Sequence, residues 1–412
     1  MKNKRAKVMA LLLGSLATIP ITGFAFNSGS DGSYGALTMT NSTTTPLTNT
    51  LTLPANGILN CTSINIGTNC VLNFVPNGLN TPVYLLAQSN IVINGIIDIS
   101  GQSGTTNGSF STVPGPGGFA GGAGGTPSAS IPAGSGQGPG GGAPINNGTS
   151  TGGAFATAGA GNSATYGNLL LVPLVGGSGG GGFSGGSTYP AASGGAGGGA
   201  IVLASSTSVT MNGGILARGG NNVLIIAPYY ISGGGSGGGV RIVAPSVSVA
   251  GFIDVSGGTN SSSPSGGYGG NGRVRIDTIS TVNAKVIGNG EGGAIPVVSY
   301  GRSLFVWPFA SPQLYFLSAA GTTIPAGATN SVAVSLPSGS STNQVVTLFG
   351  TNFLGTVPVE IVATPTTGAP FTTNIVLNFP YTNSFVQTNI TINVPAGVST
   401  TLNAFANYYV QP

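Results

Sequence analysis

The chain has 412 residues, of which 74 are glycine, two are cysteine and none is histidine, and only 4% are charged. Four of the ten basic residues lie within the first seven positions, so the rest of the chain carries six basic and six acidic residues and is formally neutral. This balance gives no support to binding of a nucleic-acid backbone, and the lack of histidine excludes catalytic triads that need an imidazole.

Residues 1–25 have the pattern of a signal peptide. Basic residues at positions 2, 4, 5 and 7 precede the apolar run VMALLLGSLATIPI, and Gly23 and Ala25 are small residues suited to cleavage before Phe26. A membrane anchor is the alternative, but the run is short for a bilayer span. No later run approaches spanning length. We therefore expect a secreted or cell-surface protein with no transmembrane segment once the signal peptide is removed.

A unit of roughly twenty residues recurs at 82–101, 200–220, 239–258 and 272–290, and the last copy is degraded. In the third copy three apolar pairs alternate with polar residues: Val240/Ile242, Val247/Val249 and Ile253/Val255. This period is typical of short strands with one buried face. We predict an all-β fold in which residues 26–301 form a right-handed, three-sided parallel β-solenoid with long glycine-rich loops. An antiparallel sandwich or prism is the alternative.

Cys61 and Cys70 are separated by eight residues in CTSINIGTNC. In an exported chain an even number of cysteines favours a disulfide, and two buried free thiols are the alternative. Two thiolates without histidine cannot complete a tetrahedral zinc shell. We expect no metal site and no cofactor.

The main insertion of the predicted solenoid, residues 102–199, is rich in glycine and has no charge. Between positions 101 and 200, 35 residues are glycine. Such a composition is typical of disorder, because glycine loses much conformational entropy on folding. Disordered tracts are usually charged, however, and the shorter tracts 231–239 and 257–272 also lie between repeat copies. The tracts can instead pack together as extended strands, so order and disorder are both open.

The composition changes at residue 302. The segment 302–317 is aromatic, and we predict that it links and caps the two parts of the chain; a sugar-stacking platform is the alternative. Its candidates for an interface or a glycan contact are Phe305, Trp307, Phe309 and Tyr315. Residues 318–412 contain strand-like runs spaced by turn residues, which predicts an immunoglobulin-like β-sandwich.

The few charged residues suggest structure rather than catalysis. Asp98 and Asp254 occupy the same place in their copies, but Leu216 lies between them, so roughly 10 Å would separate the carboxylates. That is wide for a catalytic pair, and we expect no catalytic residue and no enzyme activity. Arg241 and Arg275 also occupy equivalent positions. We predict an exposed charge cluster in which Asp277 bridges them, with independent solvation as the alternative.

Several motifs together are similar to a family of proteins. They are GSDGSYGALT, GIIDISG, GFIDVSGG, GGNGRVRID, SLPSG and NVPAGVSTTL. With the glycine tracts, they resemble glycine-rich secreted or cell-surface bacterial proteins with β-helix-like repeats and a C-terminal immunoglobulin-like domain. The resemblance implies export and a β-rich architecture. It supplies no catalytic residues, because that family has no established activity.

We therefore expect an exported, non-enzymatic structural or adhesive protein of the cell exterior. A carbohydrate-binding or polysaccharide-cleaving β-helix protein is the alternative. Partners are expected among cell-surface components, extracellular matrix components or glycans.

Overall fold

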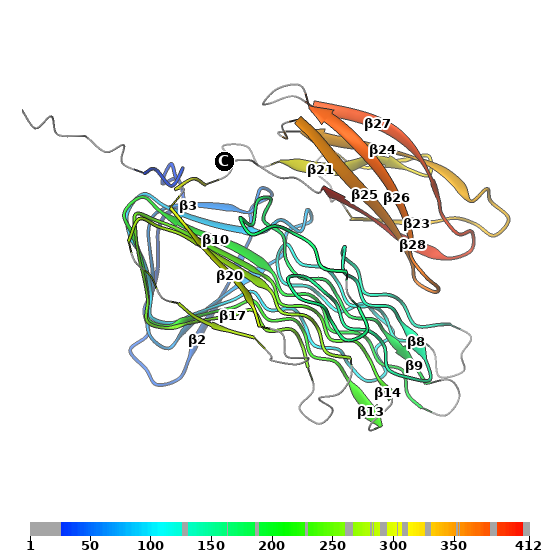
Figure 1. Cartoon of the computed structure of the whole chain (residues 1–412), viewed down its shortest axis with the longest axis horizontal. Helices are drawn as coiled ribbons and strands as arrows, with labels where there is room; N and C mark the ends of the chain where they lie inside the picture. The colour runs from blue at the N-terminus through cyan, green and yellow to red at the C-terminus, as the bar shows by residue number, and fades with distance from the viewer. Residues whose placement is uncertain are drawn as a thin grey trace, which may run out of the picture.

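The computed structural model describes residues 26–125, 131–162, 164–185, 189–226, 230–259, 267–280, 282, 284–288, 295–302, 304–306, 312–325, 331–351, 353, 355–379 and 385–406. All regular elements in these ranges are β-strands. The predicted signal peptide, Trp307 and Phe309 lie outside the described residues. Figure 1 shows a body of parallel strands and a separate antiparallel sandwich beside it.

Two parallel sheets form the strand framework of the body. The ten-stranded sheet contains β1 (Gly35–Met39), β3 (Ile58–Ile66), β5 (Val83–Ala87), β6 (Ile91–Ile93), β10 (Ala200–Ser205), β11 (Ser208–Met211), β15 (Gly239–Val243), β16 (Ser246–Val249), β18 (Arg273–Asp277) and β20 (Val297–Gly301). The six-stranded sheet contains β2 (Leu47–Thr52), β4 (Cys70–Val75), β7 (Ile96–Asp98), β12 (Gly214–Leu216), β17 (Phe252–Asp254) and β19 (Lys285–Ile287).

The prediction of a three-sided β-solenoid is wrong. The strand β3 pairs with β5 through residues 58–61 and with β6 through residues 64–66, so one long strand joins two predicted sides. The result is a parallel half-barrel of nine strands in the order β16-β11-β6-β3-β5-β10-β15-β18-β20, with β1 beside β3. Alternation in the sequence reveals buried faces, but it does not reveal whether successive short strands belong to one sheet.

Equivalent positions of the repeat copies lie side by side on neighbouring strands of the half-barrel. Leu203 pairs with Leu85 on one side and with Ile242 on the other, and Ile242 pairs with Ile276. All four side chains are fully buried. Burial of one such side chain contributes about 1.5–3 kcal/mol, so stacking of the copies builds the core between the two parallel sheets.

The glycine-rich tracts are ordered in the described residues and form a third unit of the body. We call the glycine block the segments 99–104, 115–125, 131–142, 150–155, 176–182, 193–199, 217–220, 233–239, 256–258 and 267–272. Outside turns at 116–117 and 139–140 these segments run side by side, and their backbones are hydrogen-bonded laterally to one another. Two short pairs lie at the far end of this block (Figure 1): β8 (Ile145–Asn146) with β9 (Phe183–Ser184), and β13 (Leu224–Ile226) with β14 (Tyr230–Ile231).

Hydrogen bonds in the glycine block follow a period of three residues. The successive amides of residues 180, 181 and 182 donate to Gly195, Thr151 and Gly134, which lie in three different segments. Likewise the amides of residues 194, 195 and 196 donate to Gly122, Gly233 and Gln102. A polyproline II strand has three residues per turn, so its successive amides point about 120° apart. Each segment can therefore bond to neighbours on three sides.

Close approach of the segments requires glycine. A Cβ atom added at Gly197 would overlap the carbonyl oxygen of Gly177, and one added at Gly238 would overlap that of Gly199. The same crowding demands glycine at the axis of collagen. The block is therefore held together by dense backbone hydrogen bonding and not by side-chain packing.

A second apolar layer covers the outer face of the half-barrel. Tyr84, Leu86, Val202 and Val243 point away from the inner core, yet they are buried in a cluster with residues of the covering segment (155–162 and 164–175). Leu304 and Val306 pack against the same cluster. Outward positions of these strands are therefore buried as well.

The C-terminal sandwich consists of two four-stranded antiparallel sheets. One has the order β22 (Thr322–Thr323), β21 (Gln313–Ala319), β24 (Asn343–Thr351), β27 (Phe385–Asn393), and the other β23 (Ser331–Ser335), β28 (Ser399–Ala406), β25 (Gly355–Pro365), β26 (Phe371–Phe379). The prediction of an immunoglobulin-like sandwich is wrong, because a constant-type immunoglobulin domain has the sheets ABED and CFG. In that arrangement the last strand pairs with the strand before it. Here the last described strand, β28, pairs with β23 and β25, while β27 lies in the other sheet.

Candidate functional site

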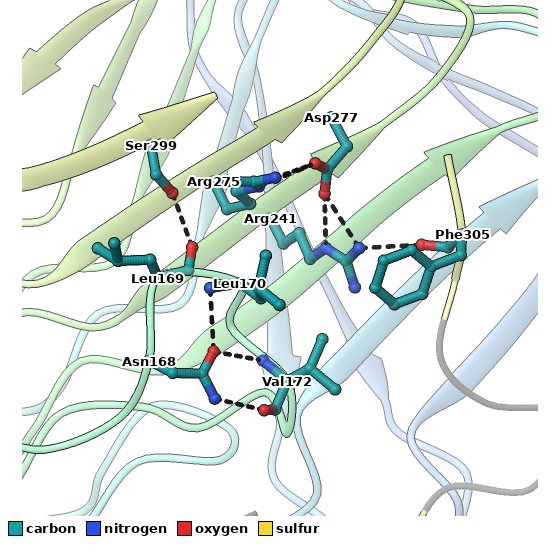
Figure 2. A network of polar contacts seen from close by, with 9 residues as sticks. All are labelled: Asn168, Leu169, Leu170, Val172, Arg241, Arg275, Asp277, Ser299 and Phe305. Carbon is teal, nitrogen blue, oxygen red and sulfur yellow. Dashed lines mark hydrogen bonds and ion pairs between the residues drawn. The ribbon is translucent and has the colours of Figure 1, made fainter. Parts of the chain in front are cut away.

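The structure brings Arg241, Arg275 and Asp277 together on the outer face of the half-barrel (Figure 2). In the register of β15 and β18, Arg241 lies opposite Arg275. Asp277 accepts hydrogen bonds from Nη2 of Arg241 at 3.0 Å and from Nε of Arg275 at 2.8 Å, through its two carboxylate oxygens. One carboxylate thus holds two guanidinium groups.

The prediction that this cluster is exposed is wrong. Arg241 is 1% exposed, Arg275 8% and Asp277 0%. The Phe305 ring lies over Arg241, and Gly301 of β20 lies against Arg275 and Asp277. Burial lowers the pKa of Arg241, and the charge and hydrogen bonds of Asp277 oppose this shift. Without the Asp277 carboxylate, two buried guanidinium cations would lie side by side with no counter-ion, so the arrangement depends on it.

Phe305 contacts this cluster. Its carbonyl oxygen accepts from Nη2 of Arg241 at 3.0 Å, and its ring centroid lies 4.5 Å from the guanidinium carbon. Hydrogen bonds hold the covering segment in place near this cluster. Ser299 Oγ donates to the Leu169 carbonyl, and Asn168 bonds to the backbone of Leu170 and Val172 (Figure 2). The first set of contacts joins β15 and β18 to residues 304–306, and the second joins β20 to the covering segment.

The aspartates of the repeat copies lie apart. In the parallel register Leu216 pairs with both Asp98 and Asp254, which places one strand between the carboxylates, or about 10 Å for two strand spacings. Asp254 forms an ion pair with Arg218 at 2.5 Å. Nowhere in the described ranges do three or more acidic or cysteine side chains gather as a metal site would require.

The disulfide prediction is wrong, because Cys61 and Cys70 are free thiols. Cys61 lies in β3 of the ten-stranded sheet and Cys70 begins β4 of the six-stranded sheet. Both side chains are buried in the core between these sheets. Burial raises the pKa of Cys61 to about 11, so this thiol behaves as a small apolar side chain.

A cleft of about 720 Å³ lies between the body and the sandwich. The body lines it with residues 79–82, 119, 139, 165–168 and 173–175, and the sandwich with 312–315, 353, 356, 358 and 404–406. None of these residues is charged. Two of the lining rings, Phe119 from the body and Phe405 from the sandwich, meet edge to face with centroids 5.1 Å apart.

The sandwich presents three aromatic rings across one sheet, which we call the aromatic row: Tyr315, Phe349 and Phe385. The centroid distances are 5.1 Å from Tyr315 to Phe349 and 5.6 Å from Phe349 to Phe385. Phe385 lies on the edge strand β27 and is 68% exposed. Tyr315, a candidate from the sequence, also lines the cleft, so the two surfaces share this residue.

A line of polar side chains runs beside the aromatic row, and we call it the polar row. Ser318 Oγ donates to Thr347 Oγ1 at 2.8 Å, and Thr347 Oγ1 donates to Asn389 Oδ1 at 2.8 Å. These residues lie on β21, β24 and β27, the same three strands as the aromatic row. The four strands of this sheet contain no charged residue. The surface therefore presents apolar rings along the aromatic row and hydrogen-bonding groups along the polar row.

Sequence reasoning missed Phe349 and Phe385. Both lie at outward positions of alternating strands, which the sequence does show. Their alignment with Tyr315 depends on the pairing of β21 with β24 and of β24 with β27, which are not all neighbours in the chain. The cleft was missed for a similar reason, because its walls come from distant segments.

No family model, curated protein or solved structure matches the chain. Among the described residues no helix is long and apolar enough to cross a membrane.

Proposed function

We propose that the chain is an exported, non-enzymatic adhesive protein of the cell exterior that binds uncharged glycans on the β22-β21-β24-β27 face of its sandwich. The observation that carries this proposal is the pairing of the aromatic row with the polar row on one uncharged sheet. Sugar rings have apolar C–H faces and hydroxyl edges, so they need aromatic contacts together with neutral hydrogen-bonding groups.

Export is supported by the pattern of residues 1–25 and by the near absence of charge in the rest of the chain. The glycine block supports an adhesive role. Its dense lateral hydrogen bonding makes it a rigid support, and it contacts the sandwich where Phe119 packs on Phe405. Phe385 is the ring of the row with the largest exposed fraction, and a ligand can reach it without any rearrangement.

An array of neutral and acidic oligosaccharides tests the binding. We expect the purified chain to retain a set of neutral glycans, and Phe385→Ala to lose about tenfold or more in affinity. Val376→Ala is the matched control, since Val376 is 57% exposed on the other sheet. Absence of glycan binding, or equal binding by the two variants, would contradict the proposed site.

Protease shaving of intact cells followed by immunodetection tests the location. We expect the protein to be lost from intact cells before a cytoplasmic marker is cut. Detection of the protein only inside the cell would overturn the adhesive function, whatever its affinity for glycans.

A further inference from the structure

We propose that the cleft between the body and the sandwich binds the hydrocarbon chain of an uncharged amphiphile. Its volume of about 720 Å³ falls within the range of roughly 300–1,000 Å³ that is usual for small-molecule sites. Five aromatic residues and five prolines line it. The aromatic residues are Phe119, Tyr166, Tyr315, Phe353 and Phe405, and the prolines are Pro82, Pro139, Pro173, Pro312 and Pro358.

Several polar groups of the cleft are already bonded within the protein. Asn80 donates to the Gly118 carbonyl and accepts from the Gly117 amide. The hydroxyl of Tyr166 donates to the Gly176 carbonyl at 2.7 Å. Thr356 donates to Asn378 at 3.1 Å. A polar ligand would lose its hydration here with little compensation, whereas a hydrocarbon chain gains from leaving water.

The charge of the ligand follows from the same lining. None of the cleft residues is ionisable as a cation or a carboxylate, so a charged group that entered would lack a partner. The cleft and the aromatic row share Tyr315. A neutral head group attached to the chain therefore reaches the face that we propose for glycans. Only this head-group assignment rests on the proposed function.

Displacement of the uncharged fluorophore N-phenyl-1-naphthylamine from the purified chain tests the inference. We expect saturable binding, displacement by dodecyl maltoside below its micelle concentration, and no displacement by maltose. Thr356→Trp places a large ring in the cleft from an exposed position and should weaken fluorophore binding by about tenfold or more. The control Thr372→Trp, exposed on a neighbouring strand of the same sheet and not part of the lining, should bind as the unmodified chain does.

Equal binding by both tryptophan variants, or no saturable binding by the unmodified chain, would overturn the site. Displacement by dodecanoate as effective as that by dodecyl maltoside would overturn the uncharged class of ligand. The result is separable from the glycan proposal, because Phe385→Ala should leave fluorophore binding intact. A chain that binds the fluorophore but no glycan contradicts the proposed function alone.

Discussion

Arg241 and Asp277 lie 36 residues apart in the sequence and form a hydrogen-bonded ion pair that is almost wholly shielded from water. Asp277 also neutralises Arg275, so removal of its charge leaves two guanidinium groups buried together. Asp277→Asn should cost about 3–5 kcal/mol of unfolding free energy. Arg241→Met should cost less, because it leaves one complete pair. Urea denaturation of the two variants measures the difference, and the reverse order would contradict a bridging role for Asp277.

The two cysteines provide a redox prediction. Because both thiols are free and buried, the native chain should react slowly with a thiol reagent and the unfolded chain should expose two thiols. A reducing agent should leave the melting temperature unchanged. Intact mass spectrometry is decisive here: a mass two hydrogens lower than that of the reduced chain would show a disulfide.

Alkaline pH should destabilise the body. Burial raises the pKa of Tyr166 well above its ordinary value, while a hydrogen bond from Ser178 and the charge of Arg273 partly oppose the shift. Burial raises the pKa of Cys61 from 9.0 to about 11. Both groups stay protonated in the folded chain at pH values where the unfolded chain already loses protons. Their stabilisation is complete below about pH 9 and is lost as the pH rises above it.

The alkaline effect can be separated from general base denaturation. Urea unfolding at pH 8, 9.5 and 10.5 should show a falling free energy of unfolding, and Cys61→Ala should flatten part of that fall. A curve whose slope is the same in the variant would show that the Cys61 thiol does not contribute.

Packing in the glycine block predicts that alanine substitutions at two glycines will differ sharply in their effect on stability. Gly197→Ala introduces a methyl group against the Gly177 backbone and should cost about 1–3 kcal/mol or more. Gly78→Ala is the control, because an added Cβ there meets no atom within 4 Å. Thermal unfolding of both variants measures the costs. Similar melting temperatures would show that the segments are not packed as described.

The sequence predicted the strands of the repeat better than their assembly. The alternation around Ile242 and Ile253 correctly marks side chains that are buried. It also marks Arg241 and Asp277 as outward, and they do point outward, but they are buried, with Phe305 over Arg241 and Gly301 against Asp277. Period-two patterns report one face of a sheet. They carry no information about a second layer supplied by a distant loop.

The candidate site was predicted only in part for the same reason. Tyr315 was identified from its aromatic neighbours in the chain, whereas its contacts in the structure are with Phe349 across the sheet and with the cleft. Cross-strand neighbours depend on register and strand order, which are set by the whole domain. Local composition therefore found one ring of the row and missed the other two.

The threefold bonding of the glycine block has a mechanical consequence. Shear applied across the glycine block acts on segments whose amides bond to neighbours on three sides, so many hydrogen bonds resist it at once. No single segment can slide without breaking contacts in several others. The same lattice makes deletions cooperative, since removing one segment leaves unpaired donors in each of its neighbours. Rupture under load should therefore occur as one large event and not as a series of small ones.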